Sequence, residues 1–142
     1  MNKILGKCWV LILNLFPLSF FSITGALGSY TVVEGVVGHP VTLPYTYSTN
    51  GGVHTACWGL GECMLFYCSK SLIWTNGYYV YYKRSSRYQL KGHISEGNLS
   101  LTIENAVQSD SGPYCCIVAI PGSFRFMTYS LEIKPDSFGE ET

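Results

Sequence analysis

The sequence predicts an all-β fold, an antiparallel sandwich of about nine short strands. Apolar and polar residues alternate over short runs, turn residues interrupt the chain often, and no ten-residue stretch shows the 3.6-residue period of a helix. The expected strands, rich in β-branched and aromatic residues, cover 32–37, 41–47, 56–58, 72–74, 78–82, 99–103, 114–120 and 127–133.

Turn residues separate these runs. Asn76-Gly77 predicts a hairpin because both residues tolerate positive φ. Residues 48–52 predict a turn, and Pro121-Gly122 marks a loop. The run 99–103 alternates apolar and polar residues, which predicts a half-buried strand.

The first 28 residues are predicted to be a cleaved secretory signal. Lys3 and Lys7 flank the start of an apolar run over 9–23, and Ala26-Leu27-Gly28 places small residues where a signal peptidase cuts. The apolar run over 9–23 is too short for a membrane span, which would need about 20 apolar residues. We therefore expect the secretory pathway, with an extracellular or cell-surface location. The expected parts are a signal at 1–28, a sandwich domain at 29–134, and a polar tail at 135–142 that begins a missing stalk or is a truncated end.

Charge and motifs exclude several classes of function. Nine basic and nine acidic residues give zero formal net charge, so neither nucleic acid nor an anionic membrane surface is an expected partner. The one basic cluster is interpreted as a solvated strand and turn in preference to a binding patch; it consists of Lys83, Arg84, Arg87 and Lys91. The chain carries no hydrolase, metalloprotease or phosphate-binding motif, so we expect neither enzymatic activity nor a cofactor.

Five cysteines follow the signal: Cys57, Cys63, Cys68, Cys115 and Cys116. A secretory route makes disulfides the default. Zinc sites favour pairs of short Cys-x2-4-Cys or His-x3-5-His clips, which are missing from this sequence, so no metal is expected. Because five is odd, at least one thiol is left over or pairs with another chain.

The stretch Asp110-Ser-Gly-Pro-Tyr-Cys-Cys116 carries the most information. It resembles the Asp-x-Gly-x-Tyr-x-Cys signature of immunoglobulin variable-type domains, whose tyrosine forms a corner two residues before a core cysteine. The resemblance gives Tyr114 and Cys116 these roles, makes Trp58 the core tryptophan of strand C, and pairs Asp110 with Arg87. A generic β-sandwich is the alternative.

One residue of that pattern is missing. The first core cysteine should stand on strand B about a dozen residues before Trp58, where this sequence has Tyr45. Cys116 is therefore expected to be unpaired. Losing such a bridge typically costs about 2–5 kcal/mol, which two other bridges could offset.

The doubled Cys115-Cys116 and the three cysteines of the C–C′ region narrow the resemblance to the T-cell immunoglobulin and mucin (TIM) domain family. Three further runs support it, 72–77, 86–92 and 100–105. The family resemblance implies bridges Cys57–Cys68 and Cys63–Cys115, which would pin the C–C′ loop to the front sheet. In the family this arrangement makes a cleft between the C–C′ and F–G loops.

The resemblance also bears on the ligand. Phosphatidylserine-binding members carry Trp-Phe-Asn-Asp in the F–G loop, where the Asn and Asp oxygens hold calcium. The corresponding run here is Ser123-Phe124-Arg125-Phe126, and neither of its last two residues supplies the oxygen that calcium needs. Calcium-dependent lipid binding is therefore not expected. The loop over 120–126 is closer to that of the rodent ferritin-binding member, which favours a protein partner.

The expected ligand-binding residues include aromatic, Met and Arg side chains, which are enriched at protein interfaces. They are Met64, Leu65 and Phe66 on one wall and Ser123, Phe124, Arg125 and Phe126 on the other. Phe124 is expected to be exposed on the loop, whereas Phe66 and Phe126 fit the core equally well. Asn98 begins an N-glycosylation sequon in a predicted turn.

These features predict the ectodomain of an immune cell-surface receptor of TIM type that binds a protein through the cleft. One alternative is a module for apoptotic-cell recognition that binds phosphatidylserine without calcium, by insertion of Phe124 with help from Arg125. The other alternative is a truncated or decayed copy without a retained function.

Overall fold

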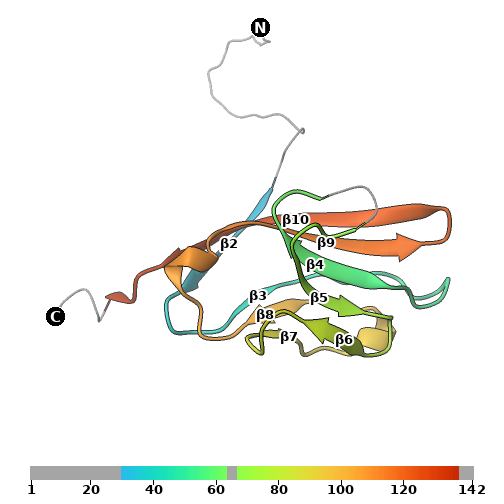
Figure 1. Cartoon of the computed structure of the whole chain (residues 1–142), viewed down its shortest axis with the longest axis horizontal. Coiled ribbons are helices and arrows are strands. Elements are labelled where there is room, and N and C mark those ends of the chain that lie inside the picture. Colours follow the sequence, from blue (N-terminus) through green and yellow to red (C-terminus); the bar gives the residue numbers. More distant parts are fainter. Residues whose placement is uncertain (1–29, 64–66, 138–142) are drawn as a thin grey trace, which may run out of the picture. The chain divides into compact units, whose positions relative to one another are not determined.

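A computed structural model describes residues 30–63 and 67–137 of the protein. Within these ranges the chain forms nine strands and two 3-10 helices (Figure 1). The strands are β2 (Thr31–Val36), β3 (Val41–Leu43), β4 (Ala56–Leu60), β5 (Ser71–Thr75), β6 (Val80–Lys83), β7 (Tyr88–Leu90), β8 (Leu101–Ile103), β9 (Gly112–Ile120) and β10 (Ser123–Lys134). The helices are η1 (Ile94–Glu96) and η2 (Gln108–Asp110).

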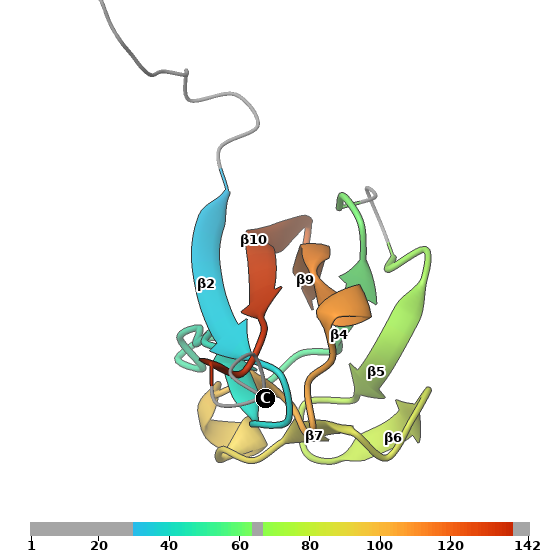
Figure 2. The same cartoon turned by 90° about the vertical axis from the view of Figure 1, so that its left-hand side faces the viewer.

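The strands form two sheets, which confirms the predicted all-β sandwich. The front sheet has six strands in the order β2-β10-β9-β4-β5-β6, and the back sheet has three in the order β3-β8-β7. Figure 2 shows β2 and β6 at opposite edges of the front sheet. Only β2 pairs in parallel with its neighbour, β10, and every other pairing between these strands is antiparallel.

The hydrophobic core lies between the two sheets. Trp58 is 1% exposed, stacks at a ring distance of 6.1 Å on Tyr129, and donates its Nε1–H to the carbonyl of Leu99 at 2.7 Å. Further fully buried side chains come from both sheets and include Leu43, Leu72, Ile73, Leu101, Ile103, Tyr114, Val118 and Leu131. Trp58 therefore holds the place in strand C that the resemblance implied.

Two predicted element boundaries are wrong. The run 78–82 begins as a turn, because the Asn76 side-chain oxygen accepts hydrogen bonds from the N–H groups of Tyr78 and Tyr79. Strand β6 starts only at Val80. At the other end of the front sheet, β10 starts at Ser123 and not near 127, so only Pro121-Gly122 separates it from β9.

Strand β8 is buried on both faces and not half-buried as predicted. Thr102 is 6% exposed, and its hydroxyl shares a 2.9 Å hydrogen bond with the hydroxyl of Thr42 on β3. The polar residue that suggested a solvent-facing side is satisfied by a partner on the neighbouring strand, which removes most of the cost of burying it.

Gly97 is expected to tolerate no side chain. It ends η1 with φ of 91°, and a Cβ there would lie 2.1 Å from the Tyr47 carbonyl oxygen. Gly97→Ala should therefore lower the free energy of unfolding by about 2–4 kcal/mol, measured by urea denaturation. The matched control is Gly51→Ala, where nothing lies within 4 Å, and it should change stability by less than about 0.5 kcal/mol. Equal losses in the two variants would contradict this account.

Candidate functional site: the outer face of the front sheet

Side chains from five adjacent strands form one row across the outer face of the front sheet. Strand register aligns Phe126 with Ile117, Ile117 with Cys57, Cys57 with Trp74, and Trp74 with Tyr82. Ile117, Cys57 and Trp74 pack in a cluster separate from the core between the sheets. The ends of the row are the accessible parts, since Phe126 is 44% and Tyr82 43% exposed.

Two disulfides lie on this face and confirm the predicted C–C′ arrangement. Cys57–Cys68 and Cys63–Cys115 join both ends of the loop 61–70 to strands β4 and β9. The buried disulfide cluster consists of Cys57, Cys68, Cys115 and Ile117. Because the bridges fix Cys63 and Cys68, a ligand that binds beside these two residues has less chain to order. Met64, Leu65 and Phe66 lie outside the described residues.

The structure corrects the predicted position of Phe124. This residue lies in β10, where it is partly buried and packs against the disulfide cluster. Phe126, two residues further along the same face, is the exposed aromatic. The prediction failed because the tight turn at Pro121-Gly122 leaves Phe124 inside a strand and not on a loop.

Arg125 and Ser123 point away from this outer face. Successive residues of a strand alternate between its two sides, and Arg125 lies close enough to Tyr45, beside the sandwich interior, to influence the pKa of its hydroxyl. The four predicted F–G residues are therefore divided between two faces. In the described part of the chain, no three acidic, histidine or cysteine side chains gather as metal ligands would.

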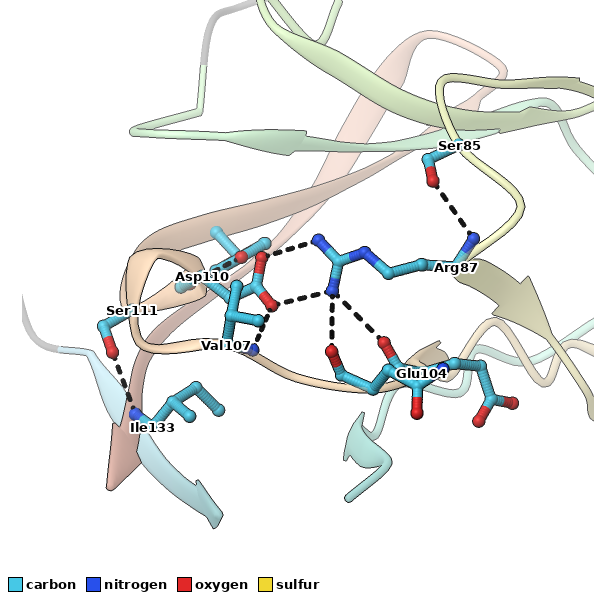
Figure 3. Close-up of polar contacts among 9 residues, drawn as sticks. Ser85, Arg87, Glu104, Val107, Asp110, Ser111 and Ile133 are labelled. Carbon is cyan, nitrogen blue, oxygen red and sulfur yellow. Dashed lines mark hydrogen bonds and ion pairs between the residues drawn. The ribbon is translucent and has the colours of Figure 1, made fainter. Parts of the chain in front are cut away.

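An ion pair between Arg87 and Asp110 lies just before the start of β9 (Figure 3). Arg87 donates from Nη1 and Nη2 to the two carboxylate oxygens of Asp110, both at 2.9 Å, and from Nη1 to the Glu104 carbonyl at 3.1 Å. The Val107 N–H donates to the same carboxylate at 2.9 Å. Burial alone would raise the pKa of Asp110, but the hydrogen bonds from Arg87 and Val107 outweigh it and hold that pKa below its ordinary value.

Tyr114, on β9, makes a further contact with Asp110. Its hydroxyl donates a 2.6 Å hydrogen bond to the Asp110 carbonyl, the geometry of a tyrosine corner. Burial raises the pKa of the hydroxyl, so it stays protonated and remains a donor. The corner and the ion pair together fix where β9 begins, and thereby which of its residues face outward.

Cys116 is buried and carries a free thiol. Burial raises its pKa well above the ordinary value, so the reactive thiolate form is suppressed. Tyr45 packs against the core cluster that contains Cys116, and its own pKa is raised first by burial and then by the neighbouring thiol. The tyrosine therefore lies beside the cysteine that lacks a partner.

Asn98, the predicted glycosylation site, lies in an isolated bridge with Thr46, directly after the turn and not within it. Its side-chain oxygen accepts the Ser100 N–H at 3.1 Å. The amide nitrogen lies so close to Gly92 that a Cβ there would be 2.3 Å away. The sequon is thus partly packed in the folded domain, and its glycosylation stays a prediction.

A tyrosine corner, a buried strand C tryptophan and an Arg–Asp pair on a two-sheet sandwich define a variable-type immunoglobulin domain. The family model described as the immunoglobulin V-set domain matches residues 29–132. The two extra disulfides on the front sheet narrow the class further. The chain belongs to the T-cell immunoglobulin and mucin domain family, since it is 64% identical to a solved structure of Tim-2 and covers 96% of that chain.

Three relatives support this assignment. The chain is 64% identical over 113 residues to T-cell immunoglobulin and mucin domain-containing protein 2 of Mus musculus, covering 79% of this chain and 37% of the relative. A solved structure of Tim-1 is 61% identical with a TM-score of 0.76, covering 78% of this chain and 97% of that one. A structure of Tim-4 in complex with phosphatidylserine is 34% identical with a TM-score of 0.69, covering 74% and 99%.

These matches identify a receptor domain and not an enzyme. The chain spans little more than a third of the length of the curated relative from mouse. Among the residues that the structure describes, no helix is long and apolar enough to cross a membrane.

Proposed function

We propose that the domain is the ligand-binding ectodomain of an immune cell-surface receptor, and that it binds a protein partner where the C–C′ loop meets the F–G hairpin. The main observation that supports this proposal is that the aromatic side chain of Phe126 is exposed next to the disulfide cluster. Exposed aromatic side chains on a rigid support are typical of the residues that dominate binding energy at protein interfaces. A signal at 1–28 would bring the domain to the cell surface or outside the cell.

Phosphatidylserine is the competing ligand, because the related Tim-4 has been solved in complex with it. Three features weigh against this ligand here. Phe124 is partly buried against the disulfide cluster, so it offers little free surface for insertion into lipid. The hairpin tip is Pro121-Gly122, which has no aromatic side chain. Positions 125 and 126 lack carboxylate or amide oxygens and lie on opposite faces of β10.

The lipid test is flotation of the secreted chain with phosphatidylserine liposomes, with calcium and with a chelator. We expect no calcium-dependent flotation, because the oxygen ligands for the metal are missing. The double variant Arg125→Asn plus Phe126→Asp is the comparison, and we expect it also to stay unbound, because the two new side chains would diverge across β10. Calcium-dependent flotation of the unaltered chain would refute the proposal and make phosphatidylserine the better-supported ligand.

The protein-partner test uses fluorescent tetramers of the secreted chain on cells that bind them. Trypsin treatment of those cells should remove binding, since it digests surface proteins and spares lipid. Phe126→Ala should weaken binding about thirtyfold, the size of an interface hot spot. Lys134→Gln is the matched surface control on the same strand and should bind as the unaltered chain does. Trypsin-resistant binding, or equal loss in both variants, would contradict the proposed surface.

A further inference from the structure

The β5–β6 end of the front sheet carries a second group of aromatic side chains, distant in sequence from the F–G hairpin. Ser71, Trp74, Tyr81 and Tyr82 line a shallow, open hollow, which we call the aromatic hollow. Tyr81 is 57% and Tyr82 43% exposed. Contiguous exposed apolar surface on a soluble domain often marks a binding site. The volume of the hollow, about 510 Å³, falls within the range of ~300–1,000 Å³ that is typical of ligand pockets.

A β-bulge gathers the aromatic rings on one face. The register of β5 and β6 shifts between Trp74 and Thr75, so that Tyr81 is an extra residue of β6 with no opposite residue on β5. Trp74 is paired with Tyr82, and its ring centroid lies 6.4 Å from that of Tyr81. A regular strand would send Tyr81 and Tyr82 to opposite faces, whereas the bulge lets both line the same hollow.

The indole of Trp74 is held in place before any ligand arrives. Its Nε1–H donates to the Ser71 hydroxyl at 2.9 Å, and that hydroxyl donates to the Cys68 carbonyl at 2.7 Å. Cys68 is itself fixed to Cys57 by a disulfide. Because the aromatic surface is ordered in advance, a ligand loses little of its binding energy to ordering the protein.

The lining of the aromatic hollow carries no charge, since it consists of one serine and three aromatic residues. Two neighbouring cations are engaged elsewhere. Lys70 lines a different pocket, beside Asp110 and Tyr114, and Lys83 donates to the Gln89 side chain at 2.8 Å. An uncharged lining favours an uncharged occupant, because a charged group would give up its hydration without gaining a counter-charge.

The hydrogen-bonding groups of the hollow narrow the occupant further. The indole N–H of Trp74 and the hydroxyl of Ser71 are already engaged with each other and with Cys68. The hydroxyls of Tyr81 and Tyr82 form no hydrogen bond with another described residue, so both are open to a ligand. The hollow therefore offers aromatic faces and two hydroxyl donors, and its lining contains no amide, carboxylate or guanidinium side chain.

A proline-rich segment in the polyproline II conformation fits this combination. Its proline rings are apolar and uncharged, and proline has no backbone N–H that would need an acceptor. Its carbonyls form no internal hydrogen bonds and can accept from a tyrosine hydroxyl. Aromatic-lined grooves are common docking surfaces for such segments, whose preformed conformation costs little entropy on binding. A sugar fits less well, because its several hydroxyls would need more hydrogen-bond partners than this lining supplies.

We propose that the aromatic hollow binds a proline-rich segment of a partner protein. The rings of Trp74, Tyr81 and Tyr82 would pack against proline rings, while the two tyrosine hydroxyls would donate to carbonyls of the segment. The hollow is separate from the surface around Phe126, because four strand spacings from β10 to β6 correspond to about 19 Å. Binding in the hollow therefore does not rest on the function proposed for that surface.

The test titrates the purified secreted chain with a capped decaproline peptide, and with a glycine–serine peptide of equal length, by NMR and calorimetry. We expect decaproline to bind at least tenfold more tightly and to shift the resonance of the Trp74 indole N–H. Tyr81→Ala and Tyr82→Ala should each weaken decaproline binding about tenfold, since each removes a ring and a donor. Tyr81→Phe keeps the ring and should weaken binding less, about threefold.

Two control variants change exposed aromatic residues outside the hollow. Tyr78→Ala lies on the same hairpin, and Phe126→Ala lies on β10. Both should leave decaproline binding unchanged. Thermal unfolding checks that every variant is folded.

Three results would overturn the proposal. These are equal affinity for the two peptides, an equal loss in Tyr78→Ala and Tyr81→Ala, or tighter binding of lactose, a neutral sugar, than of decaproline. The measurement uses no cells, no lipid and no ligand of the Phe126 surface. A failure of the proposed protein-binding function therefore leaves this result unaffected, and a failure here leaves that function unaffected.

Discussion

Replacing Tyr45 by cysteine is expected to raise the free energy of unfolding by about 2–4 kcal/mol. Tyr45 packs beside Cys116, whose thiol is buried and free. A bridge between the two positions would close a loop of about 70 residues and so restrict the unfolded chain, which is the main source of disulfide stabilisation. The loss of the packed tyrosine ring offsets part of the gain.

Guanidinium unfolding and thiol counting after alkylation would measure this effect. Tyr45→Ser is the matched control, because it removes the ring without supplying a thiol and should destabilise the domain. A free thiol that persists in Tyr45→Cys, with an unchanged unfolding midpoint, would contradict the expected bridge. Secretion of the unaltered chain at the level of the variant would also argue against a decayed copy, since two bridges would then suffice.

Asp110→Ala is expected to lower the free energy of unfolding by about 3 kcal/mol. The Asp110 side chain is only 7% exposed and accepts three hydrogen bonds, two from Arg87 and one from Val107. Removing it leaves a partly buried guanidinium without its counter-charge. Urea denaturation measures the loss, with Glu132→Gln as the control, because its contact with Lys134 is exposed and 4.0 Å long. Comparable losses in the two variants would show that burial adds nothing to the Arg87 pair.

The same pair should make stability depend on pH in the acid range. The folded pKa of Asp110 lies below its ordinary value of about 3.9, so its contribution is complete above that value and is lost as pH falls through the lower folded pKa. Unfolding curves collected from neutral pH down to about pH 3 should show a smaller acid loss in Asp110→Asn than in the unaltered chain. An identical acid loss in both proteins would assign it to other carboxylates.

The fold could be predicted because its strongest signals are local. The Asp-x-Gly-x-Tyr-x-Cys stretch contains the ion-pair carboxylate, the corner tyrosine and the inward cysteine within seven residues. The family resemblance gave both disulfide pairings, and in the structure each bridge joins a strand cysteine, Cys57 on β4 or Cys115 on β9, to a cysteine of the loop 61–70.

The candidate site was harder to predict because it depends on where hairpins turn. Pro121-Gly122 was interpreted as part of a longer loop, yet the strands continue to within two residues of each other, which buries Phe124 and exposes Phe126. The grouping of Trp74 with Tyr81 and Tyr82 escaped prediction for a similar reason. The sequence shows a tyrosine-rich run, but the bulge that brings Tyr81 and Tyr82 to Trp74 depends on the register of two strands.

The doubled cysteine of β9 has a consequence for how the chain matures. Cys115 and Cys116 are adjacent and chemically equivalent in an unfolded chain, yet one is bridged on the outer face and the other is sealed in the core. Only the pleat of a docked strand distinguishes them, since it sends neighbouring side chains to opposite sides. Oxidation of Cys63 before β9 joins the sheet would have no means of choosing between the two sulfurs. The correct pairing is therefore selected only by the assembled strand, either at first oxidation or by later thiol–disulfide exchange, so the sheet is the template for its own crosslink.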